Sequence, residues 1–216
     1  GLWFMNLCYE WGCTTTVGPG EDGSAELCRS LDWPFNGIGR NVVVARVSRP
    51  SDAGPYFNVT WPGYAGVITA MAPGRFTIAI NQAPMARRSG LKPLDWLLAR
   101  MKVGRSAALP PALLLRRVFE KCASFAEAVE MLCHTPVALP VIYSLAGTEG
   151  DAFCIIEREE NSFRLRRENL VAANHWQSPA SRDHSRGQDS PGRARLMQSF
   201  RPGFPAGLDW MVPPIL

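Results

Sequence analysis

The stretch EWGCTTTVGPGEDGSAELCRSLDW, Glu10 to Trp33, decides how the first part of the chain folds. The β-branched run Thr14–Val17 favours a strand, and the segment GPGEDGS that follows it is a strong turn signal. The segment AELCRSLDW supplies the returning strand. The stretch therefore predicts a β-hairpin that opens on Cys13 and returns with Arg29 and Asp32.

Cys13 has two interpretations, an inert core thiol at the start of a strand or a nucleophile. A nucleophilic thiol needs a neighbour that lowers its pKa or accepts its proton. No histidine is near in sequence, so a Cys–His pair would have to form with His134, His175 or His184. A chain break before Cys13 offers another base, because the freed α-amine has a pKa of about 8. Gly12 would leave its own carbonyl open to attack by the thiol.

Arg29 and Asp32 raise a geometric problem. Residues three apart on a regular strand point to opposite faces of the sheet. Both side chains can approach Cys13 only if the strand is interrupted, so we expect a bulge or a strand end near Leu31.

The order of the remaining elements predicts an α+β domain. Strands are expected first, then helices, then strands again, which suits antiparallel sheets with helices gathered on a face. We expect strands at 41–47 (buried), 56–61, 64–72, 75–81, 140–147, 152–159, 162–168 and 170–176, helices at 91–101, 110–122, 124–133 and 193–200, and a long loop at 177–192. Ser124 is the expected N-cap of its helix, with Glu127 at the capping-box position.

The composition describes a globular chain. Hydrophobic residues make up 46% and charged residues 19% of 216 residues, and no apolar run reaches the roughly 18–20 residues that span a bilayer. Eight arginines lie between Arg158 and Arg195, against five acidic residues. This interval could form an anion-binding face, but it lacks the aromatic interleaving of single-strand nucleic-acid binders, so we expect no nucleic-acid partner.

The six cysteines include no C-x-x-C pair and no Cys/His ligand spacing. We therefore expect core thiols, of which Cys122 and Cys133 on a helical pattern are examples, and no metal ion or cofactor. The chain starts without Met, in mid-pattern, and ends on the apolar run LDWMVPPIL. We expect a segment of a longer protein, truncated at both ends.

Three polar residues outside the hairpin are candidates for chemistry. Asn81 ends a strand and can be a plain turn residue. Asn174 lies in the apolar segment LVAANHW, where its amide must find partners and can also donate to a developing oxyanion. Arg193 follows DSPG and can simply be exposed on a helix.

Five motifs in order resemble the choloylglycine hydrolase superfamily, in particular its acid ceramidase and N-acylethanolamine-hydrolysing acid amidase branch. The motifs, which together extend over nearly the whole chain, are YEWGCTTTV, CRSLDWPF, WPGYAGVITAMAPGRFTIAIN, SFAEAVEMLCHTPVALPVIYSLAGT and ANHW. The resemblance implies an N-terminal nucleophile hydrolase with an αββα sandwich, made as a precursor that cuts itself between Gly12 and Cys13. Residues 1–12 would then end a propeptide or small subunit, and residues 13–216 would be a catalytic domain that is incomplete at its C-terminus.

The resemblance also implies roles for named residues. Cys13 would supply thiol and α-amine, with Arg29 beside the nucleophile and Asp32 orienting the new amine. Asn81 would be an oxyanion-hole residue and Asn174 a second active-site asparagine. Arg193 would be the late arginine of the family, a role for which Arg186 and Arg195 compete.

We expect hydrolysis of linear amide C–N bonds in N-acyl amines through a thioester, with a small-molecule N-acyl amide as the partner. Candidates for an acyl pocket are Trp61, Tyr64, Met71 and Trp176, all of which could equally be core residues. Contact with a membrane surface or lipid aggregate and association of the cleaved subunits are further expectations. An acyltransferase using the same Cys, a non-catalytic binder of amphipathic ligands, and a basic interaction domain whose binding falls with salt remain as alternatives.

Overall fold

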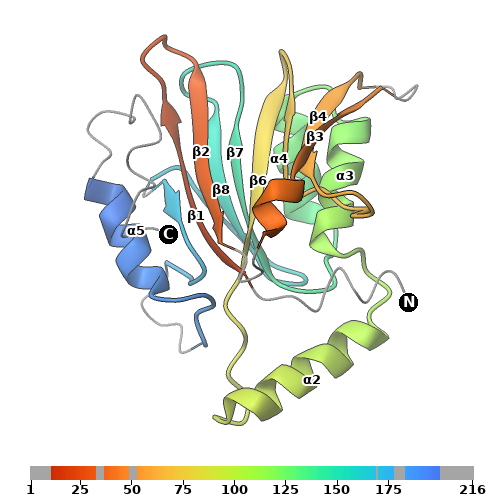
Figure 1. The fold of residues 1–216 in the computed structure, drawn as a ribbon, viewed down its shortest axis with the longest axis vertical. Coiled ribbons are helices and arrows are strands. Elements are labelled where there is room, and N and C mark those ends of the chain that lie inside the picture. The colour runs from red at the N-terminus through yellow and green to blue at the C-terminus, as the bar shows by residue number, and fades with distance from the viewer. Residues whose placement is uncertain (1–10, 33–36, 49–52, 169, 178–182, 200–216) are drawn as a thin grey trace.

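Two antiparallel sheets packed face to face form the centre of the molecule, and helices cover both outer sides (Figure 1). The computed structural model describes residues 11–32, 37–48, 53–168, 170–177 and 183–199. The layers are helix, sheet, sheet and helix. The predicted αββα sandwich is therefore confirmed.

The smaller sheet contains the predicted hairpin. Its strands are β1 (Gly12–Pro19), β2 (Ala25–Asp32) and β10 (Val171–Ala172), in the order β10-β1-β2. The register of β1 and β2 is continuous from the pair of Gly12 with Asp32 to the pair of Pro19 with Ala25. Of the two expected features near Leu31, the bulge is absent from this register, and the strand end is present because β2 ends at Asp32.

The larger sheet has the strand order β3-β4-β5-β6-β7-β8-β9, and every neighbouring pair is antiparallel. Its strands are β3 (Val43–Val47), β4 (Tyr56–Thr60), β5 (Thr69–Ala72), β6 (Phe76–Gln82), β7 (Val141–Ala146), β8 (Phe153–Arg158) and β9 (Phe163–Arg166). The short helix η1 (Ile38–Asn41) precedes β3.

Three strand predictions need correction. The strand expected to be buried at 41–47 is an edge strand, and Val44 is 64% exposed because β3 ends the sheet. The strand expected at 64–72 begins only at Thr69, since the preceding segment packs on a helix, where the Val67 N–H donates to the Ala112 carbonyl. The strand expected at 170–176 is limited to β10.

Alternation along the strands produces three apolar layers. Between the sheets, Val17 packs with Ile142, Ile155 and Leu170. A larger cluster lies between the large sheet and the helices α3 (Pro111–Lys121) and α4 (Phe125–His134). A third, small cluster lies between β10 and α5 (Ser190–Ser199).

The start of α4 follows the sequence prediction. The Ser124 hydroxyl accepts a hydrogen bond from the Glu127 N–H at 3.3 Å. The Glu127 carboxylate accepts from the Ala123 N–H at 2.8 Å, one residue before the position of an ideal capping box.

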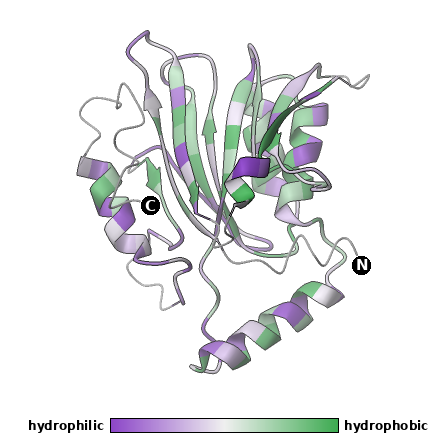
Figure 2. Ribbon diagram, in the orientation of Figure 1, coloured by the Kyte–Doolittle hydropathy of each residue, from purple (hydrophilic) through white to green (hydrophobic). Residues whose placement is uncertain are grey.

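Helix α2 (Lys92–Arg105) stands apart from the sandwich (Figure 1). Three apolar residues that lie on one side of the helix are exposed: Leu94, Leu97 and Met101. Apolar and polar residues therefore both occur on the surface of α2 (Figure 2). Its buried Asp95 accepts hydrogen bonds from Ser89 and binds His184, and these contacts tie the helix to the body.

The arginines from 158 to 195 do not form one solvated basic face. Arg158, Arg166 and Arg193 have largely buried side chains. The Arg158 guanidinium donates to the carbonyls of Leu132, Glu159, Ser162 and Thr135. It thereby satisfies backbone groups where α4 ends and where β8 turns into β9. These three arginines are therefore not available to a basic interaction surface, which weakens that alternative.

Among the described residues, no helix has the length and apolarity needed to cross a membrane, and no group of side chains forms a metal site. Cys13, Cys122, Cys133 and Cys154 are buried free thiols, and Cys28 is half-buried. Cys8 lies outside the described residues.

Replacing Arg158 with Met is expected to lower the free energy of unfolding by about 3 kcal/mol, because several buried carbonyls lose their donor. Urea unfolding measures the change. Arg164→Met, on the exposed face of β9, is the matched control and is expected to change stability by less than about 0.5 kcal/mol. Equal losses in the two variants would contradict the structural role of Arg158.

Candidate active site

Cys13 lies near the start of β1, fully buried, with its side chain between the two sheets. Its Sγ is 3.1 Å from Arg29 Nη2 and 3.8 Å from the carbonyl oxygen of Ile80 on β6. Since Thr15 pairs with Arg29 across the hairpin, Cys13 and Arg29 point from the same face of the small sheet. The hairpin register therefore brings this guanidinium to the thiol.

Arg29 is held by the opposite sheet. Its Nη1 donates to Thr69 Oγ1 at 2.5 Å and to the Ile68 carbonyl at 3.4 Å. These bonds fix the second nitrogen against the sulfur, so the cation is preorganised for a thiolate.

The electrostatics of Cys13 are a balance of opposed effects. Burial raises the pKa of the thiol above its ordinary value and is the largest effect. The Arg29 guanidinium lowers the pKa of the thiol and the Asp32 carboxylate raises it. The Gln82 backbone N–H and Arg193 lower it as well. In the uncleaved chain the neutral thiol is therefore the favoured form near neutral pH.

The peptide nitrogen of Cys13 is held as well. Its N–H donates to Asn174 Oδ1 at 2.7 Å, although the two residues are 161 positions apart. Asn174 Nδ2 donates to the Gln82 carbonyl at 2.9 Å, which fixes the orientation of the amide. The Asn174 oxygen therefore faces the nitrogen of the Gly12–Cys13 peptide bond.

Arg193 completes this cluster from α5. Its Nη1 donates to the Cys13 carbonyl at 2.6 Å and to Thr14 Oγ1 at 2.7 Å, and its Nη2 donates to Asn174 Oδ1 at 3.0 Å. Asp189 accepts from the Gly192 N–H at 3.0 Å and caps the helix, and Arg193 Nε donates to the Gln188 carbonyl at 2.8 Å, which orients the guanidinium.

Arg193 is thus the late arginine that lies at the cluster. Of its competitors, Arg186 donates from Nε to the Ala83 carbonyl at 2.9 Å, and Arg195 is exposed on α5.

Asp32 reaches the cluster from the other face of β2. It pairs with Gly12, and a Cβ added at Gly12 would lie 3.2 Å from Asp32 Oδ2. That oxygen is 3.8 Å from Arg193 Nη1, while Oδ1 is buried and has no hydrogen-bond partner in the described part of the chain. Burial is the main effect on the carboxyl and raises its pKa, while Arg193, the nearby Ser30 hydroxyl and Arg29 lower it. Arg29 and Asp32 therefore flank the junction from opposite faces, so no bulge is needed.

Gly12 is closely surrounded. Gly187 has φ +66°, and a Cβ there would lie 2.9 Å from Gly12 Cα and 3.0 Å from Arg193 Nη2. The backbone of the loop before α5 therefore covers the Gly12–Cys13 junction, and a side chain at position 187 would displace it.

Asn81 lies near Cys13 in the fold but has no hydrogen bond to it. Its Nδ2 donates to the carbonyls of Ala172 and Ala173 at 3.0 and 3.2 Å, and its Oδ1 accepts from Thr15 Oγ1 at 2.6 Å. These bonds join the two sheets. Asn81 would have to release one carbonyl to bind an oxyanion.

None of the three histidines, all of which lie in the described ranges, has a hydrogen bond to Cys13. His134 is on the exposed end of α4 beside Glu130, His175 Nδ1 is 2.7 Å from Ser190 Oγ, and His184 binds Asp95. Cys13 therefore has no histidine partner among the described residues.

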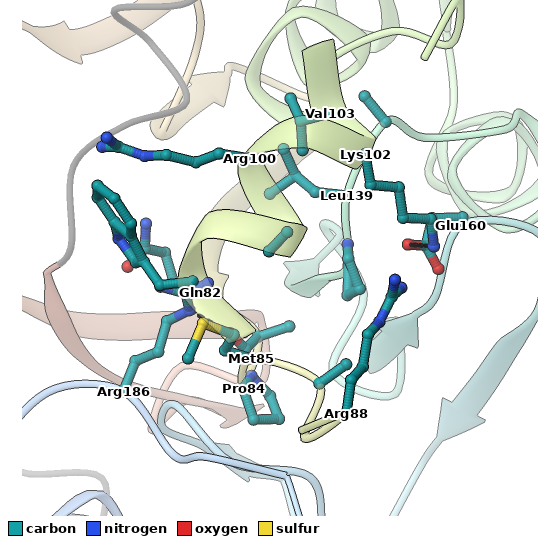
Figure 3. Close-up of a pocket in the computed structure, with 16 residues that line it drawn as sticks. Gln82, Pro84, Met85, Arg88, Arg100, Lys102, Val103, Leu139, Glu160 and Arg186 are labelled. Atoms are coloured by element: carbon teal, nitrogen blue, oxygen red, sulfur yellow. Dashed lines mark hydrogen bonds and ion pairs between the residues drawn. The ribbon is translucent and has the colours of Figure 1, made fainter. Parts of the chain in front are cut away.

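Gln82, which the sequence analysis did not single out, connects the junction to two cavities. Its Oε1 accepts from the Trp11 N–H at 3.0 Å. Gln82 and Leu139 line a cavity of about 40 Å³, walled by Trp11, Tyr64 and other apolar residues, and a second cavity of about 100 Å³ beneath α2 (Figure 3). Gln82 ends β6, and its position after Asn81 at a strand end was the signal available in the sequence.

Of the four expected acyl-pocket residues, Tyr64 lines the smaller cavity, with a buried hydroxyl that has no partner in the described part of the chain. Trp61 packs against the large core and donates to the Ile38 carbonyl. Met71 is half-exposed on β5, and Trp176 donates to Asp183 at 3.0 Å. These three do not line either cavity.

A model of the acyl-coenzyme A:6-aminopenicillanic acid acyl-transferase family matches residues 56–206, more than half of the chain. The chain belongs to this family. It is 28% identical over 159 residues to the N-acylethanolamine-hydrolyzing acid amidase of Mus musculus, which covers 72% of this chain and 41% of the relative. It is 31% identical over 171 residues to the acid ceramidase of Mus musculus, which covers 72% of this chain and 42% of the relative.

These matches confirm the family resemblance predicted from the motifs. The chain spans about two fifths of the length of these curated relatives. A solved structure of a Caenorhabditis elegans N-acylethanolamine-hydrolyzing acid amidase ortholog has the same fold. Its TM-score is 0.62 at 21% identity, with 86% of this chain and 77% of that chain covered.

Replacing Gly187 with Ala is expected to lower the free energy of unfolding by about 1–2 kcal/mol more than Gly63→Ala. Both glycines have positive φ, but a Cβ at Gly63 meets no atom within 4 Å. The control therefore carries the backbone strain without the clash at Gly12. Chemical denaturation measures both, and equal losses would show that position 187 is not packed against the junction.

Replacing Arg29 with Met is expected to raise the pKa of Cys13 further, because the cation that opposes the burial effect is removed. The rate of alkylation of Cys13, followed by peptide mass analysis, should then reach its half-maximum at a higher pH than in the parent chain. Arg46→Met, at an exposed position on β3, is the control. An unchanged or lower midpoint in the Arg29 variant would contradict the assigned contact.

Proposed function

We propose that the chain cleaves itself between Gly12 and Cys13 and then hydrolyses linear N-acyl amides with the Cys13 thiol as nucleophile. The observation that carries the proposal is that the sulfur and the peptide nitrogen of Cys13 each contact a specific side chain. The sulfur lies 3.1 Å from the Arg29 guanidinium, and the peptide nitrogen is held by Asn174 at 2.7 Å. An ordinary core cysteine needs no guanidinium at its sulfur, and its N–H is usually satisfied by a backbone carbonyl.

In the cleavage step, the thiol sulfur attacks the Gly12 carbonyl carbon. A C–S bond forms, the C–N bond to Cys13 breaks, and the thiol proton passes to the departing nitrogen. Water then hydrolyses the thioester, which gives a carboxylate on Gly12 and a free thiol on Cys13. The small Gly12 gives the sulfur access to the carbonyl.

The new α-amine would lie among groups suited to hold it. Asn174 Oδ1 already accepts from this nitrogen, and the buried Asp32 Oδ1 lacks a partner in the described part of the chain. A protonated amine would supply the donor that this carboxylate oxygen needs. Arg193, bonded to the Cys13 carbonyl, would keep the new terminus in place.

In turnover, the thiol attacks the carbonyl of an N-acyl amide, and the α-amine relays the thiol proton to the leaving amine. Water then hydrolyses the acyl thioester and restores the thiol. No metal ion takes part in this scheme. The names of the relatives, acid ceramidase and N-acylethanolamine-hydrolyzing acid amidase, support this reaction class.

Trp11 indicates where the acyl chain would bind. In self-cleavage the Gly12 carbonyl is the acyl group, and Trp11 precedes it in the chain. The Trp11 side chain lines the cavity that Tyr64 also lines. A substrate acyl chain would take the same side of the sulfur. Departure of residues before Cys13 would enlarge this cavity, so the uncleaved chain would be inactive.

Acyl transfer to an amine in place of water is a second candidate, favoured by the description of the matching family model. Both reactions share the thioester. Adding increasing concentrations of a primary amine distinguishes them, because a transferase diverts most of the acyl group to a new amide while a hydrolase continues to release mainly the free acid. We expect the free acid to dominate.

Intact-mass analysis tests self-cleavage directly. The parent chain is expected to separate at Gly12–Cys13, and Cys13→Ala is expected to stay intact. Cys28→Ala, on the α5 side of the small sheet, controls for loss of a thiol and should cleave as the parent does. A parent chain that stays whole at acidic and neutral pH and turns over no N-acyl amide would favour a non-catalytic binding protein.

A further inference from the structure

We propose that Ser190 and the neutral imidazole of His175 are positioning residues, which act through Asn174 on both reactions of Cys13. In the described part of the chain neither side chain has a hydrogen bond to Cys13, and both are bonded to the residue that holds its nitrogen, Ser190 directly and His175 through Ser190. The inference rests on the proposed function, because the rates that it concerns are those of self-cleavage and amide hydrolysis at Cys13.

Asn174 is held through its main chain as well as its side chain. Its Oδ1 accepts from the Cys13 N–H at 2.7 Å and from Arg193 Nη2 at 3.0 Å, and its backbone N–H donates to Ser190 Oγ at 2.7 Å. Ser190 is the first residue of α5, and Arg193 lies three residues further along the same face of that helix. A single helix thus contacts Asn174 at two points, so the bond to Ser190 helps to fix the oxygen that faces the Cys13 nitrogen.

The Ser190 hydroxyl requires a specific form of His175. Ser190 is fully buried, and its Oγ lies 2.7 Å from His175 Nδ1. Since Oγ already accepts from Asn174, its own proton needs an acceptor, and among the described residues Nδ1 is the atom placed to accept it. The hydrogen bonds therefore run from the Asn174 N–H to Ser190 and from Ser190 to Nδ1, with the imidazole neutral and its proton on Nε2.

Protonation of His175 would break this chain of hydrogen bonds. With a proton on both ring nitrogens, Nδ1 becomes a donor to Ser190 Oγ, and the buried hydroxyl proton loses its acceptor. The hydroxyl would have to turn or move, and the Asn174 peptide that is bonded to it would move as well. Catalytic groups lose rate when they are displaced by as little as about 1 Å, so both reactions of Cys13 should need the neutral imidazole.

The surroundings of His175 favour the neutral form. Burial is the largest effect and lowers the pKa of the imidazole below its ordinary value, and three guanidinium groups lower it further. These are Arg166 on β9 and Arg193 and Arg195 on α5. The Glu157 carboxylate on β8 is already bound, because it pairs with Arg166 at 3.0 Å and accepts from the Gln177 N–H at 3.1 Å. The rates should therefore be maintained above this pKa and fall as the pH decreases through it.

A second acid at the junction has to be separated from His175 in any pH profile. Burial raises the pKa of the Asp32 carboxyl, and its protonation would also slow Cys13 at acidic pH. His175→Asn separates the two groups, since an amide oxygen near the position of Nδ1 can accept from Ser190 and does not titrate. His175→Leu has a similar bulk and removes the acceptor.

The pH dependence of kcat/KM for an N-acylethanolamine, measured on the self-cleaved protein, tests the assignment. His175→Asn is expected to keep most of the parent activity near neutral pH and to move the acid limb to lower pH. His175→Leu is expected to lower kcat/KM about tenfold near neutral pH, mainly through kcat. His134→Asn, on the exposed end of α4, is the matched control and should leave the profile unchanged.

A double variant tests whether His175 acts through Ser190. Ser190→Ala removes the acceptor of the Asn174 N–H and should also lower kcat/KM. If the two residues act in one chain of hydrogen bonds, Ser190→Ala combined with His175→Leu should lose no more activity than Ser190→Ala alone. Urea unfolding of each variant gives the folded fraction to which the rates are referred.

The outcomes separate this inference from the proposed function. An acid limb that His175→Asn leaves in place, equal losses in His175→Asn and His175→Leu, or additive losses in the double variant would overturn the positioning role and leave the amidase proposal standing. A parent chain that neither cleaves itself nor turns over the substrate would overturn both.

Discussion

The hydrogen bond from the Cys13 N–H to Asn174 Oδ1 is the contact on which the rest of the site depends. It joins β1 to the segment after β10, two parts of the chain that are 161 positions apart. Arg193 donates to the same Asn174 oxygen and to the Cys13 carbonyl, so α5 is added to the same junction. One peptide bond is thus held by three elements that are distant in sequence.

The two guanidinium groups at the junction oppose the effect of burial on the pKa values of Cys13 and Asp32, whereas the Asp32 carboxylate adds to that effect at Cys13. Two guanidinium groups stand near a neutral thiol and a carboxylate, and desolvation raises the pKa of both acids. Removing Cys13 from its preceding residue would place a cationic amine in a site that already contains an acceptor on Asn174 and an unpartnered oxygen on Asp32. In the uncleaved arrangement Asp32 Oδ1 therefore has no donor among the described residues, at the point where a donor would appear.

Local signals in the sequence predicted the hairpin, the three middle helices and the helix that carries Arg193, because turn residues, caps and periodicity are local. The motif resemblance placed Cys13, Arg29, Asp32, Asn174 and Arg193 together, and the structure gathers them around one peptide bond. Strand alternation already indicated that Arg29 and Asp32 lie on opposite faces, but the direction of the Asn81 side chain, which turns toward β10, was beyond reach. Gln82 and the cavity beneath α2 were missed because they depend on how α2 and the loop after β6 pack, which no local pattern encodes.

The continuous register of β1 with β2 has a consequence for quality control during folding. Side chains at positions 13, 15 and 17 face the large sheet, and those at 14 and 16 face α5, so a slip of one residue would exchange the two sets. The thiol would then point away from Arg29, and Thr14 would replace it between the sheets. A misregistered chain would keep its backbone pairing and lose its chemistry. Self-cleavage would therefore occur only in molecules whose first strand had paired in the correct register, and the new N-terminus would distinguish them from misfolded molecules.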